Sequence, residues 1–232
     1  MIMTNNIEIL QLIAKGLGEL KEEVVFVGGS VAELYADDPA TSDIRPTLDI
    51  DCVVEIYTRK AYYDLEDELR KKKFTNDTRP NAPICRWIYE DITVDIMPVE
   101  TDILGFGNQW YKAGVAQKTE KTLPDGVQIF VFPVAYYLAT KFEALKGRGG
   151  ADLRLSHDFE DIIFILDNTT NIADIINNNT DASLKSYLSE QCLKLLTNKN
   201  IEEAISCALA VFCAWFVVCY VLSPCDISFS NL

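Results

Sequence analysis

The chain has 232 residues, a net charge of −14 at pH 7 and a pI near 4.5, with 49% hydrophobic and 24% charged residues. This composition is that of an ordinary globular protein of one large or two small domains, and it excludes an intrinsically disordered chain. An acidic surface repels phosphate backbones, so we expect no generic, salt-driven binding to DNA or RNA. The one dense basic run, RKKK at 70–73, is interpreted as a solvated helix end, and a patch that binds a defined RNA end is the alternative.

Cysteine usage and the N-terminus indicate the compartment. The seven cysteines are an odd number without metal-type spacing, which favours a reducing cytoplasm and no disulfide framework. The first 20 residues lack the apolar core of a signal peptide and have the pattern of an amphipathic helix. We therefore expect a cytoplasmic protein.

The first part of the chain mixes strands and helices. Apolar periodicity predicts helices, short apolar runs predict strands, and a polar run with prolines predicts a loop at 37–47. The expected elements are a helix at 5–20, a strand at 24–27, a Gly28-Gly29 turn, a helix from Ser30 to Ala36, a strand at 48–57, a helix at 60–73, a hairpin at 85–100 turning at Glu90-Asp91, and a strand at 126–133.

From Pro133 onward the pattern is helical. We expect a helix at 134–146 that ends at the glycine-rich GRGG, a helix capped by Ser156, an asparagine-rich connection at 168–181 and a helix at 182–196. Strands and helices followed by helices alone predict an α+β fold. We place a mixed catalytic domain at 1–132 and a helical domain that completes the site at 133–232.

The stretch VVFVGGS is typical of a turn that binds an anion. Gly28 and Gly29 carry no Cβ, so the backbone can approach a ligand closely. Free N–H groups and the start of the following helix favour a phosphate, and the Ser30 hydroxyl can donate to it. A plain tight turn is the alternative interpretation.

Three aspartates interrupt apolar strands. Asp49 and Asp51 are two residues apart, so both side chains leave the same face of their strand while Ile50 points into the core. Asp95 in ITVDIMP interrupts a later strand, and if the two strands are neighbours the three carboxylates converge. Like charges repel, and divalent Mg²⁺ resolves this while keeping sites for phosphates. Three carboxylates suffice for two ions, the requirement of two-metal phosphoryl or nucleotidyl transfer.

This order of motifs resembles the polymerase-beta-like nucleotidyltransferase superfamily over roughly residues 20–100. The resemblance implies a nucleotidyltransferase fold with a mixed sheet flanked by helices, an NTP such as ATP as donor, two Mg²⁺ ions, and transfer of a nucleoside monophosphate. It assigns the triphosphate to Gly28, Gly29 and Ser30, and it assigns the metals to Asp49, Asp51 and Asp95.

The second half, from LATKFEALKG to SHDFEDIIFIL, resembles the AbiEii-type toxin branch of that superfamily. The long gap after Ser30, and Arg45 ahead of the aspartate strand, also look like this branch. The resemblance implies that Lys141 contacts the nucleotide phosphates and that Asp158 helps to shape the active site, with Asp161 as the second matching aspartate. His157 stands where the branch commonly has arginine.

Plainer roles compete for several residues. Lys141 is also consistent with an exposed helix lysine, and Asp158 with stabilisation of its own helix N-terminus. Arg148 and Arg154 are alternative phosphate ligands. The single histidine, His157, is interpreted as structural and supports no Ser-His-Asp or Cys-His system. Four aromatic residues that might stack on a base are expected in the core: Trp87, Trp110, Tyr136 and Tyr137.

The run Ala204–Leu222 contains 19 residues without a charge. Its length reaches the threshold for a membrane span, but no basic cluster flanks it, and Glu202 and Glu203 precede it. A buried helix, an altered tail and a membrane anchor stay open, in that order of preference.

The sequence therefore predicts in-line attack of an acceptor hydroxyl on the α-phosphate of an NTP, with Asp95 as the base. The AbiEii resemblance suggests a toxin of a toxin–antitoxin or phage-defence pair, with a cognate antitoxin, acting on an RNA 3′ end or a protein. A small-molecule acceptor of the aminoglycoside type is the alternative, because an acidic surface attracts a polycation. A catalytically silent nucleotide-binding module is the third.

Overall fold

The computed structural model describes residues 5–38, 45–47, 49–148 and 152–208. The chain divides into two compact units: the first comprises residues 1–34 and 43–140, and the second comprises residues 35–42 and 141–232. The boundary predicted at 132/133, where the sequence pattern becomes helical, stays a prediction.

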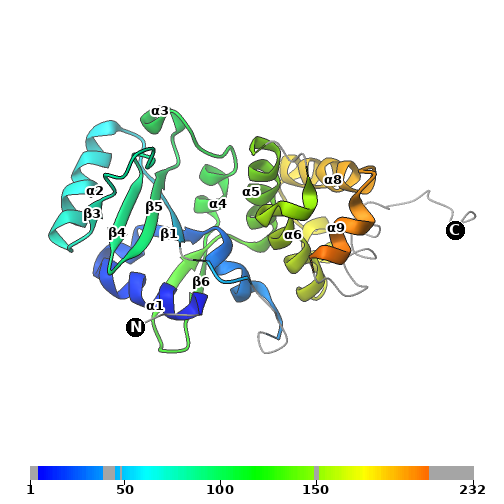
Figure 1. Ribbon diagram of the computed structural model, residues 1–232, viewed down its shortest axis with the longest axis horizontal. Helices are drawn as coiled ribbons and strands as arrows, with labels where there is room; N and C mark the ends of the chain where they lie inside the picture. Colours follow the sequence, from blue (N-terminus) through cyan, green and yellow to red (C-terminus); the bar gives the residue numbers. More distant parts are fainter. Residues whose placement is uncertain (1–4, 39–44, 48, 149–151, 209–232) are drawn as a thin grey trace, which may run out of the picture. The chain divides into compact units, whose positions relative to one another are not determined.

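The first unit is built on one mixed sheet of seven described strands, in the order β3-β4-β5-β2-β1-β7-β6 (Figure 1). β2 pairs in parallel with β5 and β1 with β7, whereas the other neighbouring pairs are antiparallel. The strands are β1 (Val24–Val27), β2 (Asp49–Val54), β3 (Thr75–Asn76), β4 (Arg86–Tyr89), β5 (Ile92–Pro98), β6 (Thr119–Thr122) and β7 (Gln128–Val131). This arrangement confirms the predicted α+β class with a mixed sheet.

Local sequence explains strand β1 and the β4–β5 hairpin. All four residues of β1 are buried, in keeping with a run of β-branched and aromatic side chains. β4 and β5 form the predicted hairpin, and both turn residues, Glu90 and Asp91, have positive φ angles of 48° and 66°. A two-residue turn of this kind fixes the register of the hairpin.

Helices flank the sheet in the first unit. α1 begins after Asn5, whose side chain accepts a hydrogen bond from the Ile7 N–H, and ends before Gly18 with φ 57°. α2 is capped in the same way by Thr58. The helical elements that begin in this unit are α1 (Asn6–Leu17), η1 (Gly18–Glu22), η2 (Gly29–Tyr35), α2 (Arg59–Lys71), α3 (Thr101–Leu104), α4 (Tyr111–Ala116) and α5 (Val134–Gly147).

The second unit is helical where the structure describes it, as predicted. Ser156 caps α6 by accepting a hydrogen bond from the Phe159 N–H. The connection predicted at 168–181 was wrong in part, because it contains a short helix whose Ile172 and Ile176 are buried. The helices are η4 (Leu153–Leu155), α6 (His157–Asn168), α7 (Ile172–Asn177), α8 (Ala182–Leu196) and α9 (Ile201–Cys207).

Side chains from separate helices hold this unit together. The Tyr187 hydroxyl of α8 donates to Glu143 of α5 at 2.7 Å, and Arg154 of η4 pairs with Glu203 of α9 at 2.8 Å. The apolar run at 204–222 begins inside α9, and its remainder lies outside the described residues. Across the ranges that the structure describes, no helix is long and apolar enough to cross a membrane.

Candidate active site

The glycine turn after β1 is shaped around one carboxylate. Gly28 has φ 76°, a backbone conformation that favours glycine. A Cβ built at Gly28 would lie 2.1 Å from Oδ2 of Asp51, so the absent side chain is what makes room for that carboxylate. The predicted turn and its contact with the aspartate strand therefore depend on glycine at this position.

The segment after the turn differs from the prediction. A 3-10 helix of seven residues, η2, begins at Gly29, whereas we expected a helix from Ser30. Such short segments gain few i→i+4 hydrogen bonds, and the tighter 3-10 pattern is common in connectors. Ser30 is buried, and its hydroxyl donates to the Val27 carbonyl at 3.4 Å, a long hydrogen bond. The hydroxyl thus closes its own turn here.

The two aspartate-bearing strands are neighbours, which was the condition for the carboxylates to converge. Asp51 of β2 is in register with Asp95 of the parallel β5, and with Val27 of β1 on its other side. Asp49, two residues earlier on the same face, is in register with Thr93. Ile50 is fully buried, which confirms that the face opposite the carboxylates belongs to the core.

An arginine that the sequence analysis did not single out holds the third carboxylate. Arg86 of β4 is in register with Asp95, and its Nε and Nη2 donate to the two carboxylate oxygens at 2.8 and 2.7 Å. These hydrogen bonds raise the pKa of the Arg86 guanidinium well above its ordinary value. The row across four strands therefore reads Val27, Asp51, Asp95, Arg86. Because the turn at 90–91 sets the hairpin register, the sequence contained the signal for this pair.

The segment that enters β2 is fixed by α1. The Asn6 side chain accepts a hydrogen bond from the Thr47 N–H at 2.9 Å and donates to the Arg45 carbonyl at 3.2 Å. The Thr47 hydroxyl in turn donates to the Asp49 carboxylate. A buried asparagine of the first helix thus positions the approach to the carboxylates, a role that sequence reasoning missed.

The residues present fit one divalent cation better than two. Asp49 is exposed and Asp51 half-buried on one strand face, and carboxylate oxygens are the ligands that Mg²⁺ prefers. Asp95 is only 8% exposed, and its carboxylate is bound by Arg86. Within the described ranges, no group of three or more His, Cys, Asp or Glu side chains is placed to hold a metal ion. The assignment of Asp49, Asp51 and Asp95 to metals stays a prediction.

Two thiols lie behind this site and are not suited to nucleophilic chemistry. Cys52 and Cys85 are free and buried. Burial, assisted by the negative charges of Asp51 and Asp95, raises the pKa of the Cys52 thiol well above its ordinary value. Burial likewise raises the pKa of Cys85 to about 12. Both thiols are therefore protonated at neutral pH.

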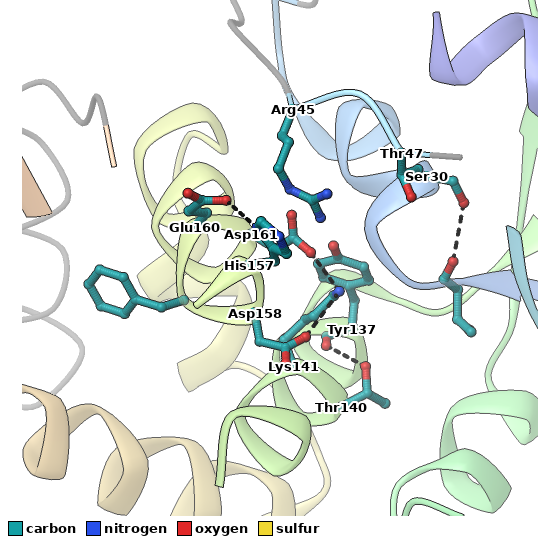
Figure 2. A network of polar contacts seen from close by, with 12 residues as sticks. Ser30, Arg45, Thr47, Tyr137, Thr140, Lys141, His157, Asp158, Glu160 and Asp161 are labelled. Atoms are coloured by element: carbon teal, nitrogen blue, oxygen red, sulfur yellow. Dashed lines mark hydrogen bonds and ion pairs between the residues drawn. The ribbon is translucent and has the colours of Figure 1, made fainter. Parts of the chain in front are cut away.

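The residues singled out in the second half form a charged cluster in the second unit (Figure 2). The Lys141 Nζ of α5 lies 2.5 Å from Oδ2 of Asp161 and 3.5 Å from Oδ1 of Asp158, both on α6. The closer contact is an ion pair by distance, although Asp161 Oδ2 has no partner with hydrogen-bond geometry. All three residues are buried, so the picture of Lys141 as an exposed helix lysine was wrong.

The alternative phosphate ligands in this unit also have carboxylate partners. Arg148 Nη1 donates to Asp158 Oδ2 at 2.8 Å, so two cations and two carboxylates balance in the cluster. Arg154 pairs with Asp152 and Glu203. His157 Nδ1 lies 3.0 Å from Glu160 Oε2 on the exposed side of α6 (Figure 2), in keeping with a structural histidine.

Two further expectations are confirmed. The four aromatic residues considered for base stacking are core residues: Trp87, Trp110, Tyr136 and Tyr137. The basic run at 70–73 closes an exposed helix end, where Arg70 and Lys71 pair with acidic residues of α2.

The fold matches a solved structure across most of its length. It is similar to the crystal structure of an antigenic nucleotidyltransferase-like protein from Paracoccidioides brasiliensis, with a TM-score of 0.53, covering 88% of this chain and 93% of that chain. The fold is nucleotidyltransferase-like. The two sequences are 17% identical, so this similarity concerns the fold and not the substrate. No protein-family model and no curated protein matches the chain.

Proposed function

We propose that the protein is a Mg²⁺-dependent nucleotidyltransferase that moves a nucleoside monophosphate from an NTP to an acceptor hydroxyl. One observation supports this above the others. Asp51 is in register with Asp95 on the neighbouring parallel strand, and a positive-φ glycine makes room for the Asp51 carboxylate on its other side. The nucleotidyltransferase-like fold also supports this proposal.

In the proposed site, the donor triphosphate binds against Gly28, Gly29 and Ser30. Asp49 and Asp51 would hold Mg²⁺ and orient the phosphates. Mg²⁺ bound there neutralises phosphate charge and lowers the pKa of an attacking hydroxyl. Asp95 would accept the proton of the acceptor hydroxyl, which requires that Arg86 release it first.

Lys141 and Asp158 enter the proposal through the resemblance to the AbiEii-type toxin branch. Lys141 would contact the donor phosphates, and Asp158 would position that lysine. The ion pairs of Lys141 with Asp158 and Asp161 support a fixed orientation for the amine. The same resemblance supports a toxin in a toxin–antitoxin or phage-defence pair, with an RNA 3′ end or a protein as acceptor.

Two other functions have a specific observation in their favour. The net charge of −14 favours a polycationic small molecule of the aminoglycoside type as acceptor. The Arg86–Asp95 pair favours a catalytically silent nucleotide-binding module, because an arginine that neutralises the third carboxylate leaves it no metal or proton to bind.

The test uses α-³²P-labelled NTPs. The purified protein is incubated with each NTP, Mg²⁺ and total RNA, lysate protein or an aminoglycoside, and both transferred label and pyrophosphate are measured. We expect label on one acceptor class and a loss of at least about 10³-fold with Asp51→Asn, since removing a group that stabilises transition-state charge costs this much.

The matched control is Asp91→Asn, which removes the same charge from the hairpin turn at a positive φ that asparagine tolerates. Its transfer rate should equal that of the wild type. Mg²⁺-dependent NTP binding without pyrophosphate release on any acceptor would favour the silent module, and absence of NTP binding would refute the proposed function altogether.

A further inference from the structure

A cavity of about 620 Å³ opens beside the carboxylates in the first unit. Its wall comes from the segment ahead of β2, from the connection between β3 and β4, and from β4 and β5. We call it the arginine cavity. The lining residues that matter here are Arg45, Asp49, Asp77, Arg79, Arg86 and Thr93.

Two of its arginines are held in the same way. Arg79 donates from Nε and Nη2 to Asp77 at 2.8 and 2.6 Å, and Arg86 donates from Nε and Nη2 to Asp95 at 2.8 and 2.7 Å. A guanidinium carries five N–H donors, so each arginine keeps the donors of Nη1. No acceptor in the part of the chain that the structure describes contacts either Nη1. Each carboxylate therefore orients a guanidinium whose other edge is available to a ligand.

The second unit contains the same arrangement, an arginine bound to the aspartate two residues before it, but there the arginine has a further carboxylate partner. Arg154 donates from Nε and Nη2 to Asp152 at 2.8 and 2.7 Å, as Arg79 does to Asp77. Its Nη1, however, donates to Glu203 at 2.8 Å. The two turns share spacing and hydrogen-bond pattern, and only the one in the arginine cavity keeps donors for a ligand.

The strand order places the arginine cavity on the acceptor side of the carboxylates. The glycine turn follows β1, whereas Arg86 and Thr93 lie on β4 and β5, and β2 with Asp51 stands between them. In an in-line displacement, the attacking and leaving oxygens lie on opposite sides of the phosphorus. With the donor triphosphate at the glycine turn, the attacking hydroxyl approaches from the side of β4 and β5.

We propose that the arginine cavity binds a phosphate group of an RNA acceptor strand next to its attacking hydroxyl. This inference rests on the proposed function and names the acceptor class for the same site. Planar guanidinium forks match phosphate oxygens, and they repel the ammonium groups of a polycation. A phosphate bound at the Nη1 edge of Arg86 leaves both hydrogen bonds to Asp95 in place, so Asp95 orients the guanidinium towards it.

The acidic net charge is consistent with this choice. Generic binding along a nucleic-acid backbone needs a long basic surface, which a charge of −14 opposes. The arginine cavity is open to solvent and is lined by Arg45, Arg79 and Arg86 beside Asp49 and Asp77, so it offers a few local phosphate contacts in an otherwise acidic protein. We therefore expect recognition of an RNA end with a small number of phosphate contacts.

The experiment measures binding apart from catalysis. A fluorescein-labelled 12-nucleotide RNA with a free 3′ hydroxyl is titrated with full-length protein by anisotropy at several salt concentrations, without NTP. We expect Arg79→Gln to raise the Kd for this RNA about tenfold, as loss of a charge-assisted hydrogen bond does, and to lower the salt slope by about 1. Arg154→Gln, the matched control, should leave both values unchanged.

A second titration identifies whose phosphate is bound. Binding of a methylanthraniloyl-labelled ATP and GTP with Mg²⁺ should be the same in wild type and Arg79→Gln. Weaker nucleotide binding with unchanged RNA binding would assign the cavity to the donor and overturn the proposal. The proposal would also be overturned if folded Arg79→Gln bound the RNA as tightly as the wild type. It would fail as well if the wild-type protein bound kanamycin, or a phosphopeptide, but no RNA. If RNA binding depends on Arg79 but no transfer occurs, the proposed function fails while the cavity assignment stands.

Discussion

The protein holds aspartates in two charged clusters that differ in access to solvent. In the second unit, Asp158 and Asp161 are 3% and 4% exposed and lie against Lys141 and Arg148. In the first unit, Asp49 is exposed and Asp51 half-buried at the edge of a cavity, beside the Arg86–Asp95 pair. A closed and balanced cluster fixes helices to one another, whereas carboxylates open to a cavity are available to a ligand.

The difference teaches how to weigh a charged motif. Moving ions out of water is costly, so buried carboxylates persist only with partners that stay in place. Exposed carboxylates stay hydrated, so lacking a partner costs them little free energy and they can exchange one ligand for another. Substitutions in the Lys141–Asp158–Asp161 cluster are thus expected to lower stability first, and nucleotide binding only through the proposed phosphate contact of Lys141. Substitutions at Asp49 and Asp51 are expected to act mainly on binding and catalysis.

The largest stability effect is expected at Lys141. Lys141→Met leaves Asp158 and Asp161 buried with one cation fewer, and breaking a buried pair in this way costs about 3–5 kcal/mol of unfolding free energy. Urea denaturation measures it. Lys146→Met, on the same helix and 63% exposed beside Glu143, should cost no more than about 1 kcal/mol. Equal stability of the two variants would show that the second cluster does not hold the unit together.

A smaller effect is expected at Gly28. Gly28→Ala strains a residue at φ 76°, at a cost of about 1–3 kcal/mol, and its Cβ would push the Asp51 carboxylate aside. Gly126→Ala is the control, because Gly126 has φ 84° and open space around its missing Cβ. Both variants should lose similar stability in thermal melts, but only Gly28→Ala should lose Mg²⁺-dependent NTP binding. Intact NTP binding in Gly28→Ala would separate the glycine turn from the site.

The open cluster should tolerate loss of a charge. Asp49→Asn keeps an acceptor for the Thr47 hydroxyl and removes one negative charge from an exposed position. We expect its unfolding free energy to stay within about 0.5 kcal/mol of the wild type in urea. Asp161→Asn in the closed cluster should be clearly less stable by the same assay. A reversed order would contradict the comparison between the two clusters.

The smallest effect is expected from Asp77 and depends on pH. Hydrogen bonds from the Arg79 side chain lower the pKa of Asp77 to about 2, below its ordinary 3.8. The folded state therefore favours the ionised carboxylate, and this contribution is present above about pH 4 and lost as the pH falls towards 2. The stability difference between wild type and Asp77→Asn should shrink over that window in denaturant titrations. If the stability difference between wild type and Asp77→Asn grew as the pH fell, the inference that ionised Asp77 stabilises the folded state would be wrong.

The sequence predicted the elements whose signals are local. The helix cap at Ser156, the hairpin turn at Glu90-Asp91 and the buried strand at 24–27 follow from residues close to one another in the chain. The adjacency of the Asp49 and Asp95 strands was a conditional expectation, because strand neighbours depend on pairing over more than 40 residues.

Partners of charged side chains were the part that could not be predicted. Nothing local to Lys141 reveals that two aspartates of the next helix bind it, since the contact depends on how α5 packs on α6. β6 and the short helix α7 were missed because the strand is mostly exposed and the helix lies in a polar run. The Arg86–Asp95 pair could have been predicted by counting outward from the hairpin turn, because that register places Arg86 opposite Asp95.

The hydrogen bonds of Asn6 connect the first turn of α1 to the segment that leads into the aspartate strand β2. Asn6 is the first residue of α1, and its side chain hydrogen-bonds the backbone of Arg45 and Thr47 shortly before the aspartate strand. An expression tag or a trimmed N-terminus is usually regarded as harmless in an enzyme preparation. In this protein, loss of Asn6 would remove both hydrogen bonds that hold the segment ahead of Asp49, so a preparation that lacks Asn6 should not be treated as equivalent to one that keeps it.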